Sequence, residues 1–66
     1  MCQMKVMLDQ EGQQELVMEN VTQLEVAEKG LKVSTFFEEP KIVTDAAVKT
    51  IDFLSGIVTF QAKHVS

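Results

Sequence analysis

Three glycines, at positions 12, 30 and 56, divide a chain of 66 residues into short segments. Gly12 lies in the polar stretch "DQEGQ" (9–13), and the other two glycines also separate segments in which apolar and polar residues alternate. Glycine adopts positive φ angles without steric cost, and at this spacing it is typical of turns between β-strands. The sequence therefore predicts an all-β fold: a small antiparallel barrel or rolled sheet of five to seven short strands built from sequential hairpins.

The alternation within the segments predicts which strands pair. The expected hairpins join residues 4–8 to 15–21, 23–28 to 31–37, and 49–54 to 57–63. In the third hairpin the residues expected to face one another across the ladder are Ile51, Phe53, Val58 and Phe60. The segment "KIVT" (41–44) adds a short strand after Pro40, a residue that suits the start or the edge of a strand.

Two stretches are also compatible with a helix. Across residues 15–30 the apolar side chains that recur at helical spacing are Val17, Met18, Val21, Leu24 and Ala27. Gly30 would be available to end that helix. The Val and Thr content and the regular hairpin spacing favour strands instead. A second, shorter helix is compatible with a start at Thr44 and Asp45, with Thr44 as its cap.

Size and charge bound what the chain can do. With 66 residues, 45% of them hydrophobic, we expect a single domain (1–66) with one modest core. The single cysteine cannot form an internal disulfide. We therefore expect oligomerisation to add stability. The net charge of −4 and the lack of arginine argue against a nucleic-acid partner. No signal-peptide pattern and no apolar run of about 18 residues is present, so we expect no membrane association and a cytoplasmic location.

The only cysteine stands at position 2, in "MCQMKV". If Met1 is removed, the amine and thiolate of Cys2 close a five-membered chelate ring, and the deprotonated amide of Gln3 closes a second. If Met1 stays, its amine joins the amide nitrogen and thiolate of Cys2 in an equivalent set. Such planar nitrogen and sulfur donors suit Ni(II) or Cu(II) better than Zn(II), and a second chain could supply a fourth ligand. Spacing alone still favours a simpler interpretation, in which Cys2 is a small, inert residue where a strand begins.

Other candidate ligands carry weaker signals. His64 lies in a segment typical of an exposed tail. Glu38 and Glu39 fit a solvated loop, with partner docking or a second metal site as the alternative. The methionines at 1, 4, 7 and 18 fit a core better than a thioether array, and "DQEG" fits a turn better than a calcium loop. No nucleophile has a positioned histidine base and no glycine-rich phosphate loop is present, so we do not expect an enzyme.

Three segments of the chain together resemble the CooT family. They are "MCQMKV" (1–6), "LEVAEKGLKVSTFFEEPKIV" (24–43) and "IDFLSGIVTFQ" (51–61). The most specific element is the initial Met-Cys followed by Lys5-Val6, although Met4 stands where a smaller residue is expected. Members of this family are small bacterial and archaeal proteins associated with nickel delivery to carbon monoxide dehydrogenase.

The resemblance implies a compact all-β homodimer that binds Ni(II) through the second-position cysteine, here Cys2, with carbon monoxide dehydrogenase as the client. Because of the resemblance, we expect Cys2 to be a metal ligand rather than an inert residue. Some relatives are described as RNA-binding, so the alternative function is a small β-barrel that binds RNA or acts as a protein-interaction adaptor without a metal. The charge distribution weakens the RNA version and leaves the adaptor open.

Overall fold

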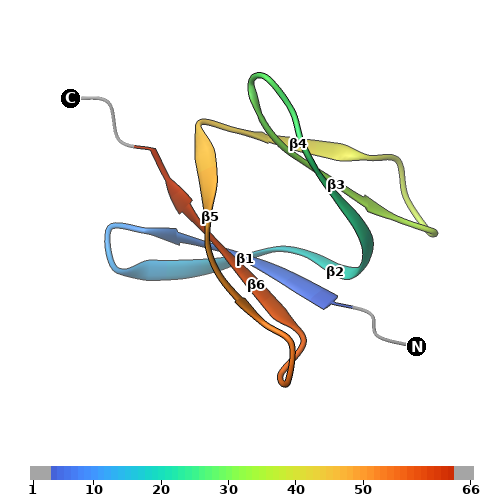
Figure 1. Cartoon of the computed structure of the whole chain (residues 1–66), viewed down its shortest axis with the longest axis horizontal. Helices are drawn as coiled ribbons and strands as arrows, with labels where there is room; N and C mark the ends of the chain where they lie inside the picture. The colour runs from blue at the N-terminus through green and yellow to red at the C-terminus, as the bar shows by residue number, and fades with distance from the viewer. Residues whose placement is uncertain (1–3, 64–66) are drawn as a thin grey trace.

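The computed structural model describes residues 4–63 and contains one six-stranded β-sheet (Figure 1). The strands are β1 (Met4–Gln10), β2 (Gln13–Val26), β3 (Gly30–Thr35), β4 (Lys41–Thr44), β5 (Ala46–Asp52) and β6 (Ile57–Ala62). Every regular element in this part of the chain is a strand, which confirms the all-β prediction. Gly12 and Gly56 adopt positive φ angles of 80° and 75°, as expected for their turns.

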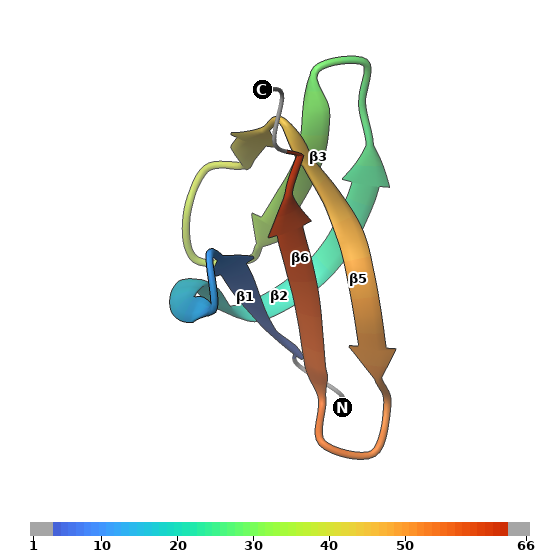
Figure 2. The ribbon, with the colours of Figure 1, turned by 90° about the vertical axis from the view of Figure 1, so that its left-hand side faces the viewer.

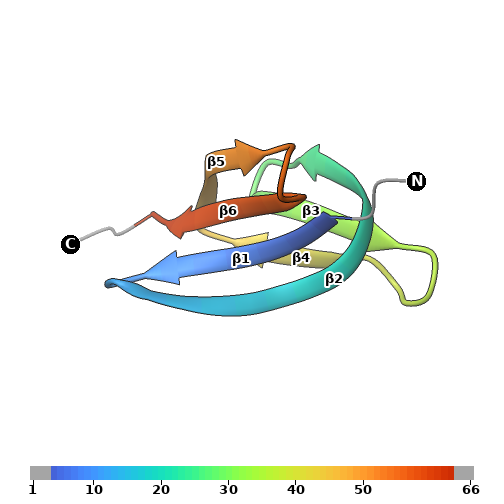
Figure 3. The same cartoon turned by 90° about the horizontal axis from the view of Figure 1, so that it is seen from below.

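The sheet rolls up because the chain changes edges between β4 and β5. The strand order is β4-β3-β2-β1-β6-β5, so β4 and β5 are neighbours in sequence but lie at opposite edges of the sheet. Asp45, with a φ of 55°, forms the whole connection between them. Figures 2 and 3 show the sheet curling into a half-barrel, with β5 brought back towards β3. The rolled sheet predicted from the sequence is confirmed.

The pairing departs from a purely antiparallel sheet at one place. The first and last strands, β1 and β6, run parallel, whereas the other neighbours are antiparallel. A hairpin at Asp45 would have reversed the chain and made the last strand antiparallel to the first. The one-residue corner turns the chain towards the other edge without that reversal, and the parallel pair follows from it.

A single bent strand replaces the helix that was considered for residues 15–30. β2 has 14 residues, and its first half pairs with β1 while its second half pairs with β3. Asn20 has a φ of 58°, and the register shifts on both sides of it. This irregularity places two buried residues, Met18 and Val21, three positions apart, and that spacing imitates a helix. The alternative helix at Thr44 is also wrong, because Thr44 ends β4.

The core lies inside the roll. Val6, Val33 and Phe60 are fully buried at its centre, one each from β1, β3 and β6. The remaining buried residues are Met18, Val21, Leu31, Ala46 and Val58. All eight are apolar, so burial of hydrocarbon surface is the main source of stability for this small domain.

The third hairpin is shorter than predicted. Ile51 pairs with Val58 as expected, but Phe60 pairs with Val48, and Phe53 lies beyond the end of β5 with 81% of its surface exposed. The strand ends there because the Asp52 carboxylate accepts hydrogen bonds from the N–H groups of Leu54 and Ser55, each at 3.0 Å. These bonds fold the following residues into a turn.

The roll has two structurally different ends (Figures 1 and 2). We call three segments together the N-terminal end: the start of β1, and the β3–β4 loop (36–40) and the β5–β6 turn (53–56), which lie on different sides of it in Figure 1. The C-terminal end comprises the β2–β3 turn (27–29), the corner at Asp45 and the end of β6.

Candidate metal centre

The three predicted ligands, Met1, Cys2 and Gln3, lie outside the described residues, and so does His64. The strand that follows them in sequence is firmly held. The N–H of Lys5 donates a hydrogen bond of 2.9 Å to the carbonyl of Gly56, and Met4 packs against the core. The described chain therefore begins at a fixed point of the N-terminal end.

Apolar side chains surround that point. Met4 lines a cavity of about 220 Å³ with the core residues Val6, Val21 and Val58. Around the rest of this end, large apolar side chains are exposed in the loop and the turn: Phe36 (77%), Phe37 (71%), Phe53 (81%) and Leu54 (99%). Large exposed apolar side chains of this kind mark surfaces that can bind other molecules.

The described residues supply no competing metal centre. Within residues 4–63, no group of three or more histidine, cysteine, aspartate or glutamate side chains could hold a metal ion. Met18 is buried and Met4 is packed against the core, which confirms the core role predicted for these two methionines. Asp9, at the "DQEG" turn, instead forms an ion pair with Lys49 at 2.7 Å.

One carboxylate at the N-terminal end is held in its charged form. The hydroxyl and N–H of Ser55, and then the N–H of Leu54, donate to Asp52 and lower the pKa of its carboxyl below the ordinary value of 3.8. These bonds favour the ionised form because they are stronger to a charged acceptor. Asp52 therefore fixes the turn that carries Phe53 and Leu54.

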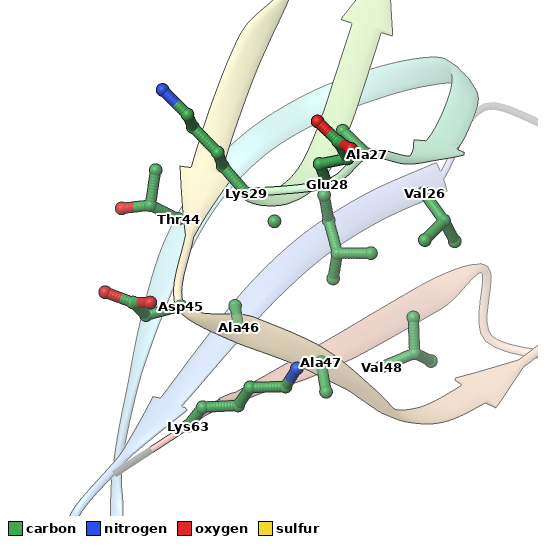
Figure 4. A pocket seen from close by; sticks show the side chains of 12 residues that line it. Val26, Ala27, Glu28, Lys29, Thr44, Asp45, Ala46, Ala47, Val48 and Lys63 are labelled. Atoms are coloured by element: carbon green, nitrogen blue, oxygen red, sulfur yellow. The ribbon is translucent and has the colours of Figure 1, made fainter. Parts of the chain in front are cut away.

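A larger cavity, of about 640 Å³, lies at the C-terminal end, where sequence reasoning gave no signal (Figure 4). Its walls come from three turn or strand-end segments that only the fold brings together, and its lining includes the buried residues Leu31 and Ala46. The Lys63 side chain extends along Ala47, whereas Lys29 points away from the cavity. Among residues 4–63, no thiol or imidazole lines it, so the described lining offers no donor suited to a soft metal.

The fold places the chain among small all-β proteins in which one rolled sheet encloses a single core. The family model described as CO dehydrogenase accessory protein CooT matches residues 1–61, and the chain belongs to the CooT family. The family assignment predicted from the three sequence segments is confirmed. The family description gives an accessory role rather than a catalytic one.

A solved structure shows the same fold. The crystal structure described as that of a candidate CooT from Carboxydothermus hydrogenoformans matches with a TM-score of 0.85 at 21% sequence identity, covering 96% of this chain and 100% of that one. No curated protein matches this chain. Within the part of the chain that the structure describes, no helix is long and apolar enough to cross a membrane.

Proposed function

We propose that this chain is a Ni(II)-binding accessory protein that delivers nickel for the maturation of carbon monoxide dehydrogenase, with Cys2 as the sulfur ligand. The observation that carries the proposal is the family match, which begins at residue 1 and so includes the Met-Cys start. The donor chemistry of that start supports nickel independently of the family, because thiolate and amide nitrogens together suit a planar d⁸ ion.

The proposed mechanism is stepwise ligand exchange with nickel as the cargo. The Cys2 thiolate and the nitrogens available from Met1 or Gln3 occupy three positions, and an entering donor from the client displaces them one at a time. Donors that are adjacent in sequence need no folded cavity to converge, so metal can leave without unfolding the core. The thiolate must be retained for binding, so a reducing, cytoplasmic location suits the proposal.

A homodimer would complete the site, with Cys2 of a second copy at the fourth position. The exposure of Phe53 and Leu54 beside the start of β1 supports an association at the N-terminal end. A chain of this size also gains stability when apolar side chains of that kind are covered. Sedimentation velocity should detect a dimer that Leu54→Glu converts to monomer, because the charge would be buried in the interface.

The test of the metal site is a Ni(II) titration of the wild type and Cys2→Ser, followed by ultraviolet charge-transfer absorption and by competition with Zn(II) and Cu(II). Loss of the thiolate should lower nickel affinity more than about 100-fold, since even changes to groups that only support a ligand cost 10–100-fold. Affinity in the wild type should also fall as the pH is lowered, because protons compete for the thiolate. His64→Ala is the matched control and should bind as the wild type does. Unchanged affinity in Cys2→Ser would rule out the assignment.

A further inference from the structure

A third cavity lies against the β3–β4 loop, separate from the one in Figure 4. It is a groove of about 450 Å³ between the middle of β2 and the end of β3. The lining residues that determine what the groove can bind are Leu16, Met18, Glu19, Thr35, Phe37 and Glu38. The groove thus joins residues 16–20 to residues 35–38, which are remote in sequence.

The charge of this groove has one sign. Within the described part of the chain, Glu19 and Glu38 are the charged residues that line it, and they come from different segments. Among residues 4–63, neither carboxylate has an ion-pair partner. Two exposed, unneutralised carboxylates beside one groove attract a cationic group.

The apolar lining suits a long cation rather than a bare metal ion. Phe37 is 71% exposed and Leu16 is 46% exposed, so the groove offers an aromatic ring and an aliphatic wall beside the two carboxylates. An aromatic face attracts guanidinium and ammonium groups, and an aliphatic wall covers the hydrocarbon stem that carries them. The described lining contributes two carboxylates, which is too few oxygen ligands for a calcium site.

We propose that this groove binds an arginine or lysine side chain presented by a partner protein. The stem of that side chain lies along Phe37 and Leu16, and its charged head pairs with Glu19 and Glu38. Arginine suits the two carboxylates best, because its planar guanidinium donates in two directions. A second copy of this chain fits poorly, since it has no arginine and carries a net charge of −4.

This inference deepens the proposed function, on which it rests, because it assigns to the client a docking contact near the start of β1, where the described chain begins. Thr35 in the groove and Met4 at the start of β1 both pair with Val21, on either side of β2. A client side chain held in the groove therefore lies two strands away from the point where the N-terminal segment joins the sheet. The loop also exposes Phe36 (77%), which offers the same partner an additional apolar contact.

The test uses the full chain and two blocked tetrapeptides, acetyl-Gly-Arg-Leu-Gly-amide and its citrulline counterpart, which has the same shape without the charge. Binding is followed by ¹⁵N chemical-shift changes. We expect saturable shifts around Glu19 and Phe37–Glu38 with the arginine peptide, and at least about 10-fold weaker binding of the citrulline peptide, as loss of a charge-assisted hydrogen bond implies. The double variant Glu19→Gln/Glu38→Gln should lose a similar factor.

Matched controls separate a specific groove from general charge attraction. Glu25→Gln/Glu28→Gln changes the net charge equally but leaves the groove intact, so it should bind the arginine peptide normally. An equal loss in that control, equal binding of the citrulline peptide, or equally tight binding of free arginine or spermidine would overturn the proposal. A loss of self-association in Glu19→Gln/Glu38→Gln would also overturn it, and would make a second copy the occupant.

The outcome is distinguishable from that of the nickel proposal. Cys2→Ser should bind the arginine peptide as the wild type does, and Glu19→Gln/Glu38→Gln should bind Ni(II) as the wild type does. Failure of nickel binding with peptide binding intact would remove the metal function and keep the docking groove. The reverse result would remove the groove and keep the metal site.

Discussion

The two ends of the rolled sheet are built from similar turns but held in different ways. At the C-terminal end the N–H of Asp45 donates to the carbonyl of Lys29 at 3.2 Å, and the N–H of Lys63 donates to the carbonyl of Asp45 at 2.7 Å. These two bonds join three separate segments. At the N-terminal end, Lys5 to Gly56 is the backbone bond, among those between described residues, that joins the first strand to the β5–β6 turn.

The two ends also differ in how far their apolar side chains are exposed to water. Leu54 and the phenylalanines of the N-terminal end are largely in water, whereas Leu31 and Ala46 at the C-terminal end are buried, although Val26 near them is 79% exposed. Apolar groups left in water contribute nothing to folding and become available to a partner. The comparison indicates that the C-terminal end stabilises the fold, and it supports the proposals that place nickel binding and docking at the N-terminal end.

The largest expected effect is at the C-terminal end, in Gly30→Ala. A Cβ at position 30 would collide with the carbonyl oxygen of Val43 and lie 2.8 Å from the Cα of Thr44. Backbone atoms cannot rotate away, so β3 and β4 must separate, and the free energy of unfolding should fall by about 3 kcal/mol. Urea denaturation measures the loss.

Gly12→Ala is the control for that change, because it adds the same methyl group at the β1–β2 turn. No atom lies within 4 Å of the added Cβ, but the φ of 80° is unfavourable for alanine. The expected loss is about 1–2 kcal/mol, from backbone strain alone. Equal losses in the two variants would show that β4 contributes little at the C-terminal end, and would break the contrast drawn between the ends.

Thr35→Val, at the end of β3 next to the N-terminal end, should stabilise the protein. The Oγ1 of Thr35 is buried and has no hydrogen-bond partner among residues 4–63. Valine has nearly the same shape and no hydroxyl to desolvate, so the free energy of unfolding should rise by about 1 kcal/mol. Thr22→Val, at a residue whose hydroxyl donates to the Ser34 carbonyl at 3.4 Å on the surface, should be close to neutral. A loss in Thr35→Val would show that the hydroxyl has a partner.

The first and third hairpins could be predicted from sequence because Gly12 and Gly56 take positive φ angles in their turns, and Gly30 marked the second less directly, since it begins β3 just after the turn. The bend in β2 and the corner before β5 could not, because Asn20 and Asp45 take positive φ angles without being glycine. Asparagine and aspartate tolerate that region but occur more often elsewhere, so their signal is weak. The parallel pairing of β1 with β6 depends on that corner and was missed for the same reason.

Of the two candidate sites, the metal site could be predicted from the sequence and the groove could not. The donor set at Cys2 could be recognised because all its atoms come from adjacent residues, and it stays a prediction. The groove could not, because Glu19 lies at the bend that the sequence did not reveal, far from Phe37 and Glu38 in the chain. The loop containing Glu38 and Glu39 was predicted only as a solvated segment, with partner docking or a second metal site as the alternative.

The smallest expected effect is in Asp52→Asn, which tests how the β5–β6 turn is held. Hydrogen bonds from Ser55 and Leu54 lower the pKa of Asp52, so its folded state favours the charged carboxylate. The stability that this adds is fully present above the unfolded pKa of 3.8 and is lost as the pH falls through the lower folded pKa. Thermal melts should therefore show Asp52→Asn slightly less stable at pH 7, with a difference that narrows below pH 3.8. A difference that stayed constant with pH would mean that geometry rather than charge fixes the turn. The hydrogen bonds of the turn would then hold it equally well to a neutral side chain.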